Sequence, residues 1–333
     1  MSAPGGLPAA IAVTGAGGFV GANVVLHLAE GGYRVVACDR DPPPHPLRQA
    51  CAPYGERVRW LPLDVTERNA WAVLDAEPPV TLIHAAALTP GSLDPSPERT
   101  MRVNVLGTIM ALEHARSRGY KRLVLISSSG VYGDIQTPLP LPEIEMPEPQ
   151  TGYAASKLAA ERYVSMYRRS FGVDACAVRL AGVYGPWERP TAARTRMSSI
   201  FTLATAAVGK RRVRVAGVDV ARDWICATDV AAGLVHVATM PAVPHDLFNL
   251  GSGRATTLQE IAHIVQELVP DAVIETTPAP HADIVYTSAD SRPALDTSRL
   301  RDTGFTVTTE LRANLQRYLE WLRGDGRFVL PTG

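Results

Sequence analysis

The chain has 333 residues, 46% of them hydrophobic and 20% charged, which is enough to bury one large core or two interlocked ones. Its 33 Lys and Arg residues balance 33 Asp and Glu residues, which excludes a general basic field of the kind that attracts nucleic acid. No apolar run is long enough to span a membrane, and the start of the chain lacks a signal-peptide pattern. The four cysteines are scattered without metal-ligand spacing, so we expect a cytoplasmic protein without a metal site.

A glycine-rich turn joins the first expected strand, over residues 10–14, to the first expected helix, over residues 21–30. Gly15 permits a tight turn, Gly18 lets a pyrophosphate approach the backbone, and Gly21 lets the helix pack on the strand. Free N–H groups and the dipole at the start of that helix favour the phosphates. The turn therefore predicts a dinucleotide site. The residues expected to contact the dinucleotide there are Gly15, Gly17, Gly18, Phe19, Val20 and Gly21.

The second and third expected strands, over residues 34–38 and 58–63, each lead into an acidic residue. Asp39 is placed to accept hydrogen bonds from the adenosine ribose and to repel a 2′-phosphate, which favours NAD over NADP. Arg40 favours the opposite choice, because a guanidinium could meet that phosphate. Asp64, followed by Val65, is a candidate for binding the adenine amino group or for capping the next helix.

Strand and helix patterns keep alternating through the first half of the chain, which predicts a parallel sheet covered on both faces. Three serines, Ser127, Ser128 and Ser129, end the fifth strand, where hydroxyls can face a cleft at the carboxyl edge of the sheet. The later expected elements are strands over 81–84, 123–127 and 174–180 and helices over 100–117 and 153–171.

The helix over residues 153–171 begins with Tyr153, and Lys157 follows four residues later. This spacing places both side chains on one helical face, one turn apart. A free tyrosine titrates near pH ~10, so lowering its pKa to about 7 requires ~4 kcal/mol, which a nearby ammonium and a cationic cofactor ring could supply. The pair therefore predicts a proton-transfer group that works near neutral pH, with a surface Tyr and Lys as the alternative.

These motifs, with His84–Ala87 reading HAAA, stand in an order that resembles the extended short-chain dehydrogenase/reductase superfamily, in its NAD-dependent epimerase/dehydratase group. The resemblance covers essentially the whole chain. It implies NAD as cofactor, Tyr153 as the acid/base, and Lys157 as the ribose ligand that also lowers the tyrosine pKa. It implies Ser128 as the hydroxyl that binds the reacting oxygen, with Ser129 as the choice one residue later. Further cofactor contacts that it implies are Ala85, Ala86, Ala87, Asn104, Ser127, Leu180 and Val183.

The expected fold class is α/β, with a Rossmann-type doubly wound parallel sheet and a smaller C-terminal α/β substrate domain. Residues 1–180 and roughly 225–247 are assigned to the NAD-binding domain, and residues 181–224 and 248–333 to the substrate domain. Asn104 interrupts a helical pattern as a poor helix former. The resemblance suggests a structural hydrogen-bonding role for it near the cofactor, and a solvent-facing position is the alternative. A homodimer joined through the helices over 100–117 and 153–171 is expected from the same resemblance.

The residues expected to determine the substrate indicate different classes of compound. Arg222 and Arg292 match positions where related enzymes hold a nucleotide diphosphate by charge-assisted hydrogen bonds. Gly182, however, stands where nucleotide-sugar enzymes commonly carry Asn, and the loop with Arg189 and Arg194 also departs from their pattern. Arg189, Arg194 and Arg196 of that loop could bind a phosphate or a carboxylate, or could lie in a solvated loop. A free sugar or sugar acid therefore stays open beside a nucleotide sugar.

The catalytic motifs are compatible with more than one reaction or role. Dehydratases of the group carry an acidic residue beside the serine, where this chain has Ser129 and Gly130, so dehydration is disfavoured. An epimerase returns the hydride to the other face of the sugar, whereas a dehydrogenase releases NADH. The prediction is an NAD-dependent epimerase acting on a sugar or nucleotide sugar, with a sugar dehydrogenase as the alternative. A non-catalytic dinucleotide sensor is less favoured, because such proteins often lose the Tyr or the Lys.

Overall fold

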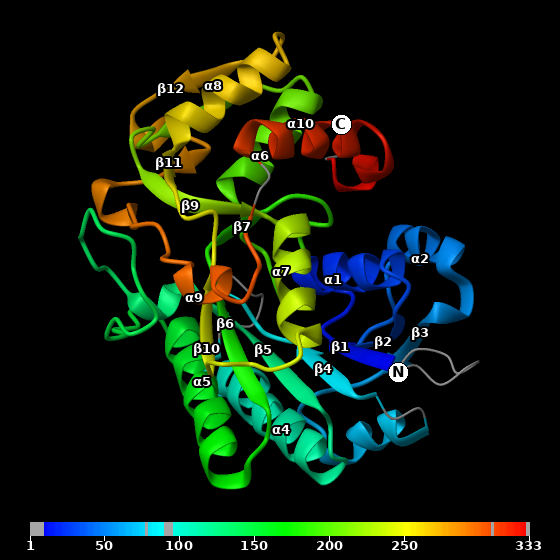
Figure 1. Ribbon diagram of the computed structural model, residues 1–333. Helices are drawn as coiled ribbons and strands as arrows, with labels where there is room; N and C mark the ends of the chain where they lie inside the picture. Colours follow the sequence, from blue (N-terminus) through cyan, green and yellow to red (C-terminus); the bar gives the residue numbers. More distant parts are fainter. Residues whose placement is uncertain (1–9, 77–78, 90–95, 308–309, 331–333) are drawn as a thin grey trace.

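The computed structural model describes residues 10–76, 79–89, 96–307 and 310–330. A parallel sheet with helices on both faces forms the lower part of the molecule in Figure 1, and a smaller unit from the second half of the chain lies above it. The α/β class and the Rossmann-type sheet expected from the sequence are confirmed.

The main sheet has seven parallel strands in the order β10-β6-β5-β4-β1-β2-β3. The order runs outward in both directions from β1 and β4, so a crevice opens at their carboxyl ends. The strands are mostly apolar and buried because helices cover both faces. Their bounds are β1 (Ala10–Thr14), β2 (Arg34–Asp39), β3 (Val58–Pro62), β4 (Thr81–His84), β5 (Arg122–Ser128), β6 (Ala175–Leu180) and β10 (Leu247–Leu250).

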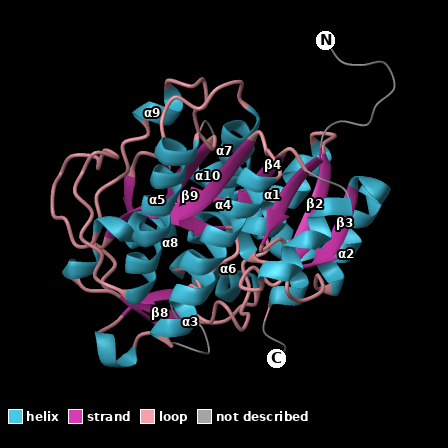
Figure 2. Cartoon of the chain, turned by 90° about the horizontal axis from the view of Figure 1, so that it is seen from below, coloured by secondary structure: helices cyan, strands magenta, loops and turns pink. Residues whose placement is uncertain are grey.

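Two pairs of long helices cover the sheet, and Figure 2 shows the strands lying between helices. Helices α1 (Phe19–Glu30) and α7 (Ala227–Thr239) pack together on one face, with α2 (His45–Cys51) beside α1. Helices α4 (Gly107–Ser117) and α5 (Gly152–Phe171) pack on the other. Helix α5 starts where the Thr151 hydroxyl accepts from the Ala154 N–H, and it ends at Gly172 in the left-handed conformation.

The expected helix over residues 100–117 is in fact three segments, α3 (Pro97–Met101), the π-helical turn η3 (Arg102–Leu106) and α4. The π turn inserts an extra residue into the helical repeat, and such turns are frequent at functional sites. Asn104 lies within it and is buried. Helical periodicity alone does not reveal this turn, but the predicted helix is present, because helical structure runs without a gap over residues 97–117.

The smaller unit has its own core, formed where two short sheets meet three helices. One sheet has the order β11-β9-β7 and the other β12-β8-β13. Its strands are β7 (Gly182–Tyr184), β8 (Val213–Ala216), β9 (Ala221–Cys226), β11 (Ala255–Thr257), β12 (Ile274–Thr276) and β13 (Ile284–Val285). Its long helices are α6 (Ser199–Val208), α8 (Leu258–Leu268) and α10 (Leu311–Arg323).

Short helical segments connect these elements. They are η1 (Ala52–Arg57), η2 (Arg68–Ala76), η4 (Ser129–Tyr132), η5 (Ala279–His281), η6 (Ser288–Asp290), α9 (Ser298–Arg301) and η7 (Asp325–Val329).

Strand β10 corrects the expected division of the chain. The sequence placed the boundary after residue 247, but Leu247–Leu250 pairs in parallel with β6 and completes the main sheet. The boundary therefore moves to residue 250 or beyond. The chain enters the smaller unit after β6, returns to the sheet at α7 and β10, and then leaves again.

Candidate active site

A pocket lies at the carboxyl ends of β1, β2, β3 and β4, where the topology places the crevice. Its glycine turn packs closely against neighbouring backbone. Gly15 has φ +66°, and a Cβ there would come within 2.7 Å of the Ala86 backbone. A Cβ on Gly21 would collide with the Gly15 carbonyl, so helix and strand pack as closely as the sequence predicts. Expected cofactor residues that line this pocket are Gly15, Gly17, Gly18, Asp39, Arg40, Asp64, Val65, Ala85, Ala86 and Ala87.

Asp39 hydrogen-bonds the backbone of the glycine turn and also lines the pocket. Its Oδ2 accepts from the Gly17 N–H at 2.9 Å and its Oδ1 from the Arg40 N–H at 2.8 Å. Burial raises the pKa of Asp39, and these backbone hydrogen bonds oppose that rise. Arg40 pairs with Asp41 at 2.8 Å on the surface. Its charge is thus shared with a neighbouring carboxylate, which weakens the case for a 2′-phosphate.

Asp64 makes local hydrogen bonds in a turn and also lines the pocket. Its Oδ1 accepts from the Thr66 N–H at 2.9 Å and from the Thr66 hydroxyl at 2.7 Å, which fixes the turn after β3. The same side chain lines the pocket, beside Val65. These contacts close the turn before η2 (Arg68–Ala76), and a place in the pocket lining is compatible with the predicted adenine contact.

Asn104 connects the pocket wall to the helix that carries Tyr153. Its amide oxygen accepts from the Leu88 N–H at 2.8 Å, and its amide nitrogen donates to the Leu88 carbonyl at 3.0 Å and to the Ser156 hydroxyl at 2.9 Å. Leu88 itself lines the pocket. With 1% of its surface exposed, Asn104 does not face solvent, so that alternative is wrong.

The tyrosine and lysine share one face of α5, but their immediate partners differ from expectation. Lys157 Nζ donates to the Ile126 carbonyl at 2.9 Å and lies 5.9 Å from the centre of the Tyr153 ring. Burial lowers the pKa of Lys157 to about 8, and Glu161 opposes this shift. Burial also raises the pKa of Tyr153, while a hydrogen bond with Ser128 and the charge of Arg194 favour its ionised form. The charge of Arg194 thus acts on Tyr153 from a loop that the sequence did not connect with it.

The three serines at the end of β5 separate according to strand geometry. Ser127 and Ser128 point to opposite sides, as successive strand residues do. Ser127 is buried and donates to Glu161 Oε1 at 2.5 Å, so its hydroxyl is engaged away from the cofactor pocket. Ser128 is the hydroxyl close to Tyr153, which favours it over Ser129, the first residue of η4. The expected cofactor role of Ser127 has no support in this geometry.

A buried ion pair behind the active-site helix was missed from the sequence. Glu161 receives Arg179 in a bidentate contact, with Nη2–Oε2 2.8 Å and Nε–Oε1 3.0 Å. The Arg179 guanidinium lies 4.5 Å from the centre of the Tyr132 ring. The available sequence signal was the spacing of Lys157 and Glu161, which are also one helical turn apart.

The remaining cofactor candidates lie outside the lining of the pocket described above. Leu180 is buried at the end of β6, and Val183 lies in β7, one strand of the smaller unit. Gly182 also lies in β7, where a Cβ would crowd the Trp224 ring at 2.9 Å and the Asp223 carbonyl at 3.0 Å. This glycine is accounted for by packing against β9 rather than by a substrate.

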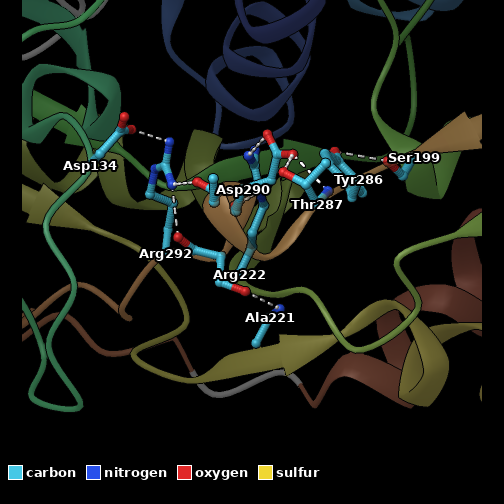
Figure 3. Close-up of polar contacts among 10 residues, drawn as sticks. Asp134, Ser199, Ala221, Arg222, Tyr286, Thr287, Asp290 and Arg292 are labelled. Carbon is cyan, nitrogen blue, oxygen red and sulfur yellow. Dashed lines mark hydrogen bonds and ion pairs between the residues drawn. The ribbon is translucent and has the colours of Figure 1, made fainter. Parts of the chain in front are cut away.

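Arg222 and Arg292 lie near each other with acidic partners, as Figure 3 shows. Arg222 donates from Nε to the Asp290 carbonyl at 2.9 Å and lies 4.9 Å from the centre of the Tyr286 ring. Arg292 pairs with Asp134 at 2.5 Å. Burial and the neighbouring Arg292 lower the pKa of Arg222. A diphosphate at this cluster would replace carboxylate partners with its own negative charge.

Arg189 and Arg194 are not solvated loop residues. Arg189 lines the cofactor pocket and donates from Nη2 to the Gly17 carbonyl at 2.8 Å. Arg194 pairs with the buried Glu188 at 2.6 Å and lies 5.3 Å from the centre of the Phe19 ring. The structure thus places Arg189 against the glycine turn rather than in the Arg222 and Arg292 cluster, contrary to its expected substrate role.

His84, the first residue of the HAAA stretch, is a buried neutral side chain. It shares a 2.7 Å hydrogen bond with the Thr14 hydroxyl, and burial lowers its pKa to about 3. Within the described residues, no group of three or more His, Cys, Asp or Glu side chains is arranged to hold a metal ion. In the same part of the chain, no helix is both long and apolar enough to cross a membrane.

The fold and this site define an NAD-dependent enzyme of the extended short-chain dehydrogenase/reductase type. Residues 11–251 match the NAD dependent epimerase/dehydratase family, and the chain belongs to that family. It is 31% identical to a UDP-glucose 4-epimerase of Mycolicibacterium smegmatis, over 95% of this chain and 99% of that one. It is 26% identical to a probable UDP-glucuronate 4-epimerase of Rhizobium meliloti, over 93% and 95%. The crystal structure of a Thermus thermophilus UDP-glucose 4-epimerase in complex with NAD is similar, with TM-score 0.78, 25% identity, and coverage of 95% and 99%.

Proposed function

We propose that this protein is an epimerase that inverts one hydroxyl-bearing carbon of a nucleotide sugar. The observation that carries the proposal is the placement of Tyr153 beside Ser128 and one turn from Lys157, at the carboxyl edge of the sheet. Near full-length similarity to curated 4-epimerases supports the reaction class.

NAD, when bound, would accept the hydride from the reacting carbon and later return it. Tyr153 would take the proton of the substrate hydroxyl through its phenolic oxygen and give it back after the sugar has turned. Ser128 would hold the reacting oxygen by a hydrogen bond, and Arg194 would favour the ionised tyrosine. Lys157 would orient the nicotinamide ribose, anchored by the Ile126 carbonyl. No group in this set distinguishes the two faces of the sugar, so inversion requires only that the intermediate rotates.

The nucleotide part of the substrate is proposed from the Arg222 and Arg292 cluster. Two cationic side chains from separate segments of the smaller unit converge there, and the Tyr286 ring lies beside Arg222. Guanidinium groups bind phosphate oxygens in a bidentate manner, and an aromatic ring offers a surface for the base. A free sugar would leave this cluster unused, so we favour a nucleoside diphosphate sugar over a free sugar or sugar acid.

The test is to incubate the NAD-loaded protein with UDP-glucose, UDP-glucuronate and the corresponding free sugars while following NADH absorbance and product stereochemistry. The proposed function predicts interconversion of the epimers of a UDP-sugar, with no net accumulation of NADH. Stoichiometric NADH release would instead establish the dehydrogenase. Tight NAD binding without turnover of any sugar would favour the sensor.

We also propose a homodimer in which the face formed by η3 and α5 is the contact surface. Met101 at the end of α3, Leu106 at the end of η3 and Phe171 at the end of α5 are large apolar side chains with exposures of 43%, 38% and 52%. Exposed apolar groups that gather on one face commonly mark a protein contact.

The four cysteines are free thiols, which supports a cytoplasmic setting.

A further inference from the structure

The segment of residues 187–196 joins the smaller unit to the NAD pocket, and we refer to it as the strap. Its start is held firmly. Trp187 adopts φ +70°, a left-handed conformation that is uncommon for a bulky residue. The ring centres of Trp321 and Phe328 lie 5.6 Å from its own. Such a conformation persists only where the surroundings determine it, so the packing of Trp187 sets the path of the strap.

A buried carboxylate fixes the remainder of the strap. Glu188 is fully buried, and its two oxygens receive the Arg194 guanidinium, the Ser198 N–H at 2.6 Å and the Ser198 hydroxyl at 2.7 Å. The Thr191 and Arg194 backbones also hydrogen-bond each other, at 2.8 and 3.1 Å. These contacts hold the strap in one conformation and therefore fix where its side chains point.

The strap is attached to the sheet unit on two sides of the cofactor pocket. The Ala193 carbonyl accepts from the Thr89 N–H at 3.2 Å and from the Thr89 hydroxyl at 2.8 Å. On the other side, Asn23 of α1 donates to the Pro186 carbonyl at 2.9 Å, just before the strap begins. Strap residues that line the pocket are Arg189, Thr191, Ala192 and Ala193.

Arg189 is the charged group that the strap brings to this pocket. Its Nη2 donates to the Gly17 carbonyl, whereas Nη1 is buried and has no hydrogen-bond partner among the described residues. Burial lowers the pKa of Arg189, and the negative charge of Asp39 opposes this shift. The buried guanidinium thus has an unused N–H donor beside the glycine turn. An anionic oxygen would satisfy that donor and balance the charge. The phosphates of a dinucleotide bind at that turn.

We propose that Arg189 binds the pyrophosphate of NAD, so that the strap of the smaller unit closes over the cofactor. The inference rests on NAD as the cofactor and deepens the proposed function without depending on which sugar reacts. It changes the role of Arg189 from the predicted binding of substrate to the binding of cofactor. It also gives the strap a reason to cross between the units, because an enclosed dinucleotide would be held in place while it carries the hydride taken from the sugar.

The test is calorimetric titration of the full-length protein, freed of copurified NAD, with NAD, ADP-ribose and adenosine. For Arg189→Gln we expect the dissociation constants of NAD and ADP-ribose to rise by roughly ten- to a hundredfold, because a charge-assisted hydrogen bond is lost. Adenosine, which lacks the pyrophosphate, should bind both proteins equally. Arg196→Gln is the matched control, since it removes the same charge from an exposed strap position that does not line the pocket.

Arg189→Lys distinguishes a direct contact from a distorted turn. It retains the charge, so it should recover part of the ADP-ribose affinity, and it replaces the glutamine variant if that protein does not fold. Unchanged NAD affinity in Arg189→Gln would overturn the inference, and so would an equal loss for adenosine. If the wild-type protein does not epimerise any sugar but Arg189→Gln still weakens ADP-ribose binding, only the proposed function fails.

Discussion

At the scale of single residues, chemistry depends on how burial and neighbouring charges act on two groups of α5. Tyr153 and Lys157 are both withdrawn from water, which favours the neutral form of each. The opposing influences come from Ser128 and Arg194 for the tyrosine and from Glu161 for the lysine. The proposed proton transfer would therefore involve side chains from β5, α5 and the strap together.

Replacing the tyrosine hydroxyl should separate catalysis from cofactor binding. We expect Tyr153→Phe to reduce turnover by about 10²- to 10⁴-fold, the usual contribution of a positioned acid/base, while NAD affinity changes little. Tyr163→Phe, on the exposed side of the same helix, is the control. The measurement is the rate of epimer interconversion beside an NAD titration. Full activity of Tyr153→Phe would remove it from the mechanism.

The buried lysine predicts a pH dependence of stability. The pKa of Lys157 is about 8 in the folded protein and 10.5 as a free group, so the unfolded chain binds more protons between these values. Stability of the wild type relative to Lys157→Met should therefore rise as pH increases from 8 to 10.5, by up to roughly 3 kcal/mol, and be constant below pH 8. Urea unfolding at several pH values measures this difference. Lys121→Met, at an exposed site, should give a flat difference, and a flat result for Lys157→Met would contradict the shift.

At the scale of elements, the π-helical turn η3 carries a buried side chain that joins two parts of the fold. It presents Asn104 so that one amide bonds both backbone groups of Leu88 and also reaches Ser156 on α5. The pocket wall and the helix with the proposed acid/base are thereby held in register by one buried side chain.

Removing the amide of Asn104 should lower the stability of the fold and loosen the contact between the pocket wall and α5. Asn104→Ala would leave the N–H and carbonyl of Leu88 unpaired in a buried place, and we expect a loss of about 3 kcal/mol in the free energy of unfolding. Asn69→Ala, exposed on η2, should cost far less. Urea denaturation of both variants makes the comparison. A loss below about 1 kcal/mol for Asn104→Ala would show that water or a shifted backbone replaces the amide.

Local patterns explain what the sequence could predict. The glycine turn and the pair Tyr153 and Lys157 are set by spacings of a few residues, so they are visible without a fold. The π turn leaves no such trace, and β10 is a four-residue strand whose membership depends on pairing with β6, far away in sequence. Arg189 was grouped with the substrate because nothing in its neighbours reveals that Trp187 and Glu188 direct it across to Gly17. The direction of a loop is a tertiary property.

At the scale of the whole molecule, the proposed dimer joins the surfaces of η3 and α5. Leu106→Arg places a charge on that surface, and we expect it to shift the protein from dimer to monomer because an unpaired charge is costly to bury. Leu139→Arg, at a position that is 68% exposed in a different loop, should leave the mass unchanged. Light scattering of the purified proteins gives the answer. A monomeric wild type would exclude this dimer.

The return of the chain to the main sheet has a consequence for synthesis on the ribosome. Strand β6 is complete at residue 180, but its outer neighbour β10 does not emerge until residue 250. Throughout that interval the nascent protein carries a buried-type apolar strand with an open hydrogen-bonding edge, the kind of edge that recruits foreign strands. A pause or truncation between these two points would therefore produce an aggregation-prone fragment, even though the glycine turn, Ser128, Tyr153 and Lys157 have already been made.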